Sequence, residues 1–82
     1  MKDPVQTREA ARAVVTSMVS RTVEDSESLI SSGLIDSLSI LKLIGKLEDR
    51  IGMRLPTERL QPDDFETIDT IVETVERVAE PK

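Results

Sequence analysis

Residues 32–38 read Ser-Gly-Leu-Ile-Asp-Ser-Leu and lead into an amphipathic run that ends at Gly52. Asp36 is a favourable N-cap residue, because its carboxylate can accept from the free N–H groups of a first helical turn. Its charge also suits the positive end of the helix dipole. Gly52 suits the left-handed conformation that commonly ends a helix. We therefore predict a helix between these residues and expect the rest of the chain to be organised around it.

This predicted helix has two apolar faces. Its main stripe has the i, i+3, i+4, i+7 spacing of a core-facing surface and contains Ile40, Leu43, Ile44, Leu47 and Ile51. Leu38, Leu41 and Gly45 lie on a second face, with Ser37 at its start. An exposed apolar patch marks a binding surface more often than a scattered leucine does. Glycine inside a helix costs about 1 kcal/mol relative to alanine, so Gly45 needs a reason, such as close approach by a partner or by another helix.

The flanking segments predict two more helices and one helical turn. The first helix spans about 4–20, with Asp3 as N-cap and Pro4 at its first position. Its apolar stripe contains Ala11, Val14, Val15, Met18 and Thr22. After an extended region around Pro56, residues 61–65 form a helical turn with Phe65 in the core. Thr67 caps the last helix, whose buried stripe contains Ile68, Ile71, Val72, Val75, Val78 and Ala79.

The segment 21–35 between the first two helices is loop-like. Its acidic first half gives way to apolar residues, so we expect Leu29 and either Leu34 or Ile35 to enter the core and hold Ser37 in place. The predicted fold class is all-α. It is a small up-and-down four-helix bundle of residues 1–82, with three main helices, one short helix and a long first loop.

Composition excludes several functional classes. The chain has 82 residues and no cysteine or histidine, which removes disulfides, most zinc sites and catalysis by Ser-His or Cys-His pairs. Its net charge of −5 argues against nucleic-acid binding. The acidic residues from Asp25 to Asp36 fail the calcium-loop pattern, because the required glycine is replaced by Ile30. No apolar run approaches the ~20 residues of a membrane span, and no signal-peptide core is visible. We expect a cytoplasmic monomer without a metal.

Residues 33–41, Gly-Leu-Ile-Asp-Ser-Leu-Ser-Ile-Leu, resemble the shared motif of acyl carrier and peptidyl carrier proteins. The resemblance covers most of the chain, from the first helix to Val78, and implies the four-helix fold of acyl-carrier type. It also implies that Ser37 carries 4′-phosphopantetheine donated from coenzyme A, whose thiol holds an acyl or aminoacyl group as a thioester. Asp36 would cap and orient, and Leu38, Leu41 and Gly45 would contact partner enzymes.

The resemblance implies a carrier that presents substrate rather than an enzyme with catalytic residues. Its partners would be a phosphopantetheinyl transferase, an acyl- or aminoacyl-loading enzyme, and a downstream transferase or synthase. Carriers of bacterial fatty-acid synthesis usually have a strongly acidic second helix, whereas this helix mixes both signs. We therefore expect a free-standing carrier for a dedicated pathway of polyketide, nonribosomal-peptide or D-alanyl type. The alternatives are a general fatty-acid carrier and an unmodified carrier-fold interaction or regulatory module, in which Ser37 only caps the helix.

Overall fold

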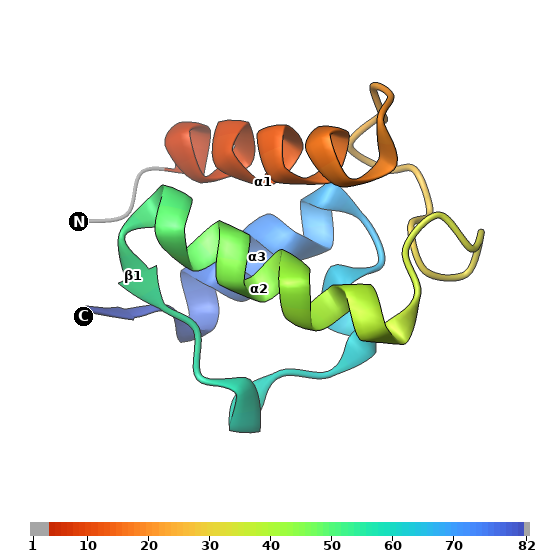
Figure 1. The fold of residues 1–82 in the computed structure, drawn as a ribbon. Helices are drawn as coiled ribbons and strands as arrows, with labels where there is room; N and C mark the ends of the chain where they lie inside the picture. The colour runs from red at the N-terminus through yellow and green to blue at the C-terminus, as the bar shows by residue number, and fades with distance from the viewer. Residues whose placement is uncertain (1–3, 82) are drawn as a thin grey trace.

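The computed structural model describes residues 4–81 and is mostly helical (Figure 1), as the sequence predicts. In chain order its elements are α1 (Pro4–Val19), α2 (Ser37–Ile51), β1 (Met53–Arg54), η1 (Thr57–Arg59), η2 (Pro62–Phe65), α3 (Ile68–Val78) and β2 (Glu80–Pro81). Both η elements are 3₁₀ helices. The fold class is confirmed, with two additions that the sequence did not predict. These are η1 and a two-stranded antiparallel pairing of β1 with β2.

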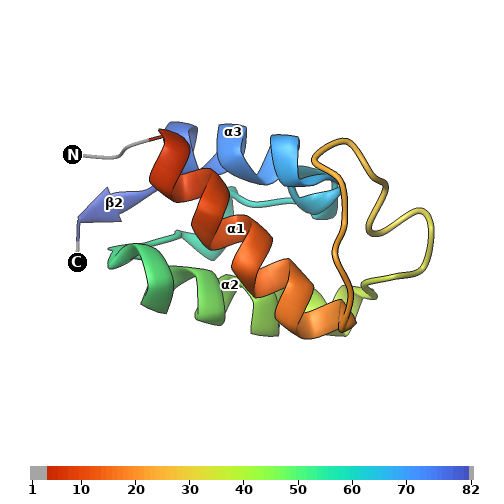
Figure 2. The ribbon, with the colours of Figure 1, turned by 90° about the horizontal axis from the view of Figure 1, so that it is seen from above.

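Helix α1 lies diagonally across both α2 and α3 (Figure 2). Seen from above, α2 and α3 run in the same direction, so the expected alternation of up and down helices is wrong between these two elements. The cause is the connection between them. Residues 52–67 form extended segments and 3₁₀ turns, which carry the chain back along α2 before α3 begins.

The helix ends follow local chemistry. Helix α1 begins at Pro4, as predicted, while its expected N-cap Asp3 lies outside the described residues. It ends at Val19 because Ser20 adopts a left-handed conformation with φ of 60°. Helix α2 ends as predicted at Gly52, which has φ of 67° and donates its N–H to the Glu48 carbonyl at 2.9 Å.

The core lies between the three α helices and takes side chains from the loops. Leu29 and Ile35 are buried and Leu34 is half-buried, which confirms that the long loop enters the core. Phe65 is also buried, as predicted. Thr22 was wrongly assigned to the apolar stripe of the first helix. It lies beyond the helix end and is exposed, and the neighbouring Val23 is buried in its place.

Helix α3 begins with a reciprocal cap. The Thr67 hydroxyl accepts from the Thr70 N–H at 3.0 Å, and the Thr70 hydroxyl accepts from the Thr67 N–H at 3.0 Å. The predicted cap is therefore confirmed. The first turn of α1 and strand β2 lie at one end of the molecule, and α2 begins at the other end (Figure 1).

Candidate functional site

Ser37 is the first residue of α2 and is exposed. Its hydroxyl makes no hydrogen bond to any other residue within 4–81. The preceding residue, Asp36, is the N-cap, and its carboxylate accepts from the Ser39 N–H at 2.8 Å. The predicted cap is thus confirmed, and the serine beside it is left open to solvent.

The charge state of Asp36 follows from these contacts. Hydrogen bonds from the Ser39 backbone and hydroxyl hold the pKa of the Asp36 carboxyl below its ordinary value. Asp36 is therefore ionised at neutral pH and is a poor proton acceptor for the Ser37 hydroxyl. Asp36 caps the helix that begins with Ser37.

Glu66 fastens the loop before Ser37 to the turn before α3. Its carboxylate accepts from the Ser31 N–H at 3.2 Å, from the Ser31 hydroxyl at 3.0 Å and from the Ser28 hydroxyl. These bonds, chiefly that from Ser28, lower the pKa of the Glu66 carboxyl. The Glu66 carbonyl accepts from the Leu29 N–H at 2.7 Å. Polar contacts with Glu66 therefore hold the loop next to the buried Leu29.

A second set of polar contacts, made by two arginines of α1, holds the earlier half of the same loop. The Arg8 guanidinium donates to Asp25 at 2.8 Å and to Asp69 at 2.6 Å, which links α1, the loop and α3. Arg12 contacts Asp25 as well and donates to the Val23 carbonyl at 2.7 Å. Because the loop is fixed at both places, the position of Ser37 is set by the folded domain as a whole.

A groove of about 160 Å³ lies next to Ser37. It runs between α2 and the segment that contains η1 and η2, and most of its lining is apolar. The lining residues are Ser37, Ile40, Leu41, Ile44, Thr57, Leu60, Gln61, Pro62 and Phe65. An exposed, unbonded hydroxyl beside an open groove fits the attachment of a large flexible group. The contributions from Thr57, Leu60 and Gln61 were missed by the sequence analysis, because nothing local places them beside Ser37.

The second face of α2 is exposed, as predicted. The exposed fraction is 83% for Leu38 and 66% for Leu41. A Cβ atom built on Gly45 would meet no other atom within 4 Å. Close packing of another helix therefore does not explain Gly45.

Comparison with known proteins identifies the class. The family described as "Phosphopantetheine attachment site" matches residues 11–78, which includes α2 and α3 in full. The chain belongs to this family of carrier proteins, whose cofactor is covalently attached 4′-phosphopantetheine.

Among curated proteins, the chain is similar to D-alanyl carrier proteins of streptococci. It is 39% identical over 49 residues to that of Streptococcus sanguinis, a match that covers 60% of this chain and 62% of the relative. It is 35% identical over 52 residues to that of Streptococcus pyogenes serotype M1, covering 63% of this chain and 66% of the relative. The matches thus span somewhat less than two thirds of each relative's length.

No helix within residues 4–81 has the length and apolar character needed to cross a membrane. No group of three or more acidic side chains in the same range is arranged to hold a metal ion.

Proposed function

We propose that this protein carries an aminoacyl group, of D-alanyl type, as a thioester on 4′-phosphopantetheine attached to Ser37, for one dedicated biosynthetic pathway. The observation that carries the proposal is the exposed, unbonded Ser37 hydroxyl at the capped start of α2. Membership of the phosphopantetheine family supports the cofactor. The similarity to D-alanyl carrier proteins supports the type of cargo.

In the attachment step, the Ser37 Oγ attacks the β-phosphorus of coenzyme A. A new P–O bond forms to the serine oxygen, the bond to the 3′,5′-adenosine bisphosphate leaving group breaks, and the serine proton leaves. Asp36 is a weak base for that proton, because hydrogen bonds from Ser39 lower the pKa of its carboxyl and the carboxylate already accepts from the Ser39 N–H. The base and the metal therefore come from a phosphopantetheinyl transferase. When bound, the arm supplies a thiol that holds the cargo.

The domain then presents its cargo to other enzymes without carrying out chemistry itself. A tethered thioester reaches a partner's active site at a high effective concentration. A loading enzyme and a downstream transferase or synthase are the required partners. Leu38, Leu41 and Gly45 form an exposed surface directly after Ser37, and we assign partner recognition to this surface.

The first experiment incubates the purified protein with coenzyme A and a broad-specificity phosphopantetheinyl transferase, followed by intact mass and peptide mapping. The expected result is the gain of one phosphopantetheine on the peptide that contains Ser37. Ser37→Ala should abolish the gain, and Ser39→Ala, two residues away on the same helix, should retain it. A correctly folded wild-type protein that gains nothing would contradict the proposal and favour the unmodified interaction module.

The second experiment tests the cargo. The modified protein is incubated with ATP, D-alanine and a purified D-alanine-activating ligase, and its mass is measured again. A gain of one alanyl group that hydroxylamine removes is expected for a thioester. The contrary result is a modified protein that accepts no alanine and yet accepts another acyl group from a different loading enzyme. That result would overturn the D-alanyl assignment and leave the proposed carrier function in place.

A further inference from the structure

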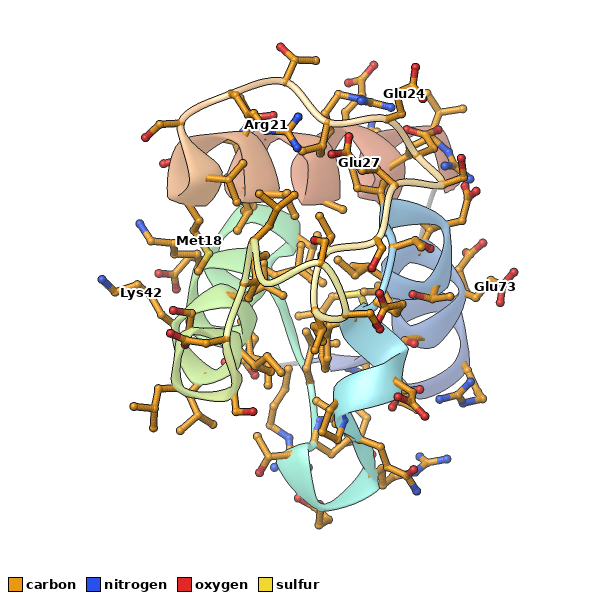
Figure 3. All side chains as sticks on the ribbon, turned by 90° about the vertical axis from the view of Figure 1, so that its right-hand side faces the viewer. Met18, Arg21, Glu24, Glu27, Lys42 and Glu73 are labelled. Atoms are coloured by element: carbon orange, nitrogen blue, oxygen red, sulfur yellow. The ribbon has the colours of Figure 1, made fainter. Side chains whose placement is uncertain are left out.

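Helix α2 carries its three basic side chains along one flank. Lys42, Lys46 and Arg50 are spaced four residues apart, so they line up along the helix. All three are exposed, and none forms an ion pair or side-chain hydrogen bond with another residue in 4–81. Figure 3 shows Lys42 extending away from the molecule on the α2 side. We call these three residues the basic ridge.

The acidic residues of the same helix form no ion pair with the ridge within residues 4–81. Glu48 accepts from the Leu55 N–H at 2.7 Å, so its carboxylate is occupied by the segment after β1. Asp49 lies beside the ridge and lines the same cleft as Lys46 and Arg50, but it forms no ion pair within the described residues. The helix that looked mixed in sequence therefore has one flank on which cations outnumber anions.

Negative charge gathers on the opposite side of the molecule. Glu73 extends outward from α3, on the side facing away from Lys42 (Figure 3), and Glu76 on the same helix is also exposed. The chain has a net charge of −5. An acidic partner would therefore be repelled by most of the surface and attracted at the ridge.

The ridge is bordered by hollows and by the apolar patch. A cleft of about 250 Å³ lies between α1 and the part of the ridge formed by Lys46 and Arg50. A second one, of about 260 Å³, is lined by Ser17, Met18, Ser39, Lys42 and Lys46. Leu38 lies one helical turn before Lys42, so the exposed leucine and the ridge form one continuous line along α2. A partner surface that covers Leu38 would also meet Lys42 and Lys46.

We propose that the basic ridge docks an acidic surface of the enzyme that loads the phosphopantetheine arm, a surface that presents Asp or Glu side chains beside an apolar pocket for Leu38 and Leu41. This inference rests on the proposed carrier function. Its physical basis is charge complementarity, which raises the association rate and selects the orientation that brings α2, and hence Ser37, to the partner. A nucleic-acid partner is disfavoured, because three cations on an acidic chain neutralise few phosphates.

The test measures loading by the D-alanine-activating ligase, on protein already shown by mass to carry phosphopantetheine. The variants are Lys46→Glu, Lys42→Glu/Lys46→Glu and the control Arg59→Glu. Arg59 is exposed on η1 and forms no ion pair within the described residues, so its single substitution changes the charge by the same amount as Lys46→Glu. Circular dichroism establishes that each variant is folded.

The double variant should lose about tenfold in kcat/KM, mainly through a higher KM. Lys46→Glu should lose less, and Arg59→Glu should stay within about twofold of wild type. Raising the salt from about 0.1 M to about 1 M shortens the screening length from about 10 Å to about 3 Å. Wild type and Arg59→Glu should therefore lose activity with salt, while the double variant changes little.

Four results would overturn the inference. Unchanged kcat/KM in the double variant, or equal losses in Lys46→Glu and Arg59→Glu, would show that the ridge has no specific role. Cosedimentation with phosphatidylglycerol vesicles that the double variant loses, with loading unaffected, would assign the ridge to an anionic lipid surface instead. A wild type that never gains phosphopantetheine or alanine would remove the proposed function and this inference together, and the mass spectra distinguish that case.

Discussion

Gly45→Ala should stabilise this protein, although it alters a residue assigned to partner recognition. Gly45 lies in the interior of α2, has no positive φ, and has open space where a Cβ atom would be placed. The substitution therefore adds no contact and creates no clash. What changes is helix propensity, and alanine is favoured over glycine by about 0.8–1 kcal/mol in a helix interior.

The expected gain is therefore about 1 kcal/mol in the free energy of unfolding, or about 4–8 °C in Tm for a domain of this size. Gly52→Ala is the matched control. Gly52 is also surrounded by open space, but its φ is 67°, a conformation that costs an L-residue about 1 kcal/mol. The two substitutions add the same methyl group, and their effects should have opposite signs.

Urea unfolding followed by far-ultraviolet circular dichroism measures both effects. The chain has no tryptophan or tyrosine and a single phenylalanine, so the helical signal is a better probe than intrinsic fluorescence. An unchanged or lower midpoint for Gly45→Ala would refute the reasoning, because it would mean that the position is crowded or not regular helix. A stabilised variant that is loaded more slowly would place Gly45 in the docking surface, whereas normal loading would exclude it.

Two further predictions concern the exposed leucines and Glu66. Leu38→Ala and Leu41→Ala should each leave the free energy of unfolding within about 0.5 kcal/mol of wild type while lowering kcat/KM for phosphopantetheine transfer. A large loss of stability would show that these side chains belong to the core. The folded-state pKa of Glu66 lies below its ordinary value of 4.5, so its contribution to stability is present above that pH and is lost as the pH falls through the folded pKa. The urea midpoint of wild type should therefore exceed that of Glu66→Gln at neutral pH and converge with it in acid. Parallel curves across the whole range would contradict the role of Glu66.

The parts of the fold that follow from nearest neighbours could be predicted from sequence. Asp36 and Gly52 bound α2 because capping depends on groups within one turn. The exposure of Leu38 and Leu41 follows from helical period, because both fall outside the stripe that faces the core. Phe65 is buried because a single aromatic side chain in a small aliphatic core has few other places to pack.

Features that depend on distant contacts could not be predicted in this way. The first helix ends at Val19, close to the predicted end at about residue 20, but Ser20 is a residue type that gives no strong stop signal, and so Thr22 was placed in the stripe. Strands β1 and β2 have two residues each, too few to show an alternating pattern. The contacts of Glu66 with Ser28 and Ser31 join residues that are far apart in the sequence, and no sequence pattern indicates such a pairing. The basic ridge is a different case, because the four-residue spacing of Lys42, Lys46 and Arg50 is visible in the sequence, whereas their exposure is seen only in the structure.

The placement of Ser37 at the end of the molecule opposite the first turn of α1 and strand β2 (Figure 1) has a practical consequence. A tag, a solid support or another protein joined through either of those segments would lie at the end of the molecule away from the modified serine. Such a fusion should leave the serine accessible to enzymes, so immobilised protein is a suitable substrate for measuring transferase and ligase binding on a sensor surface.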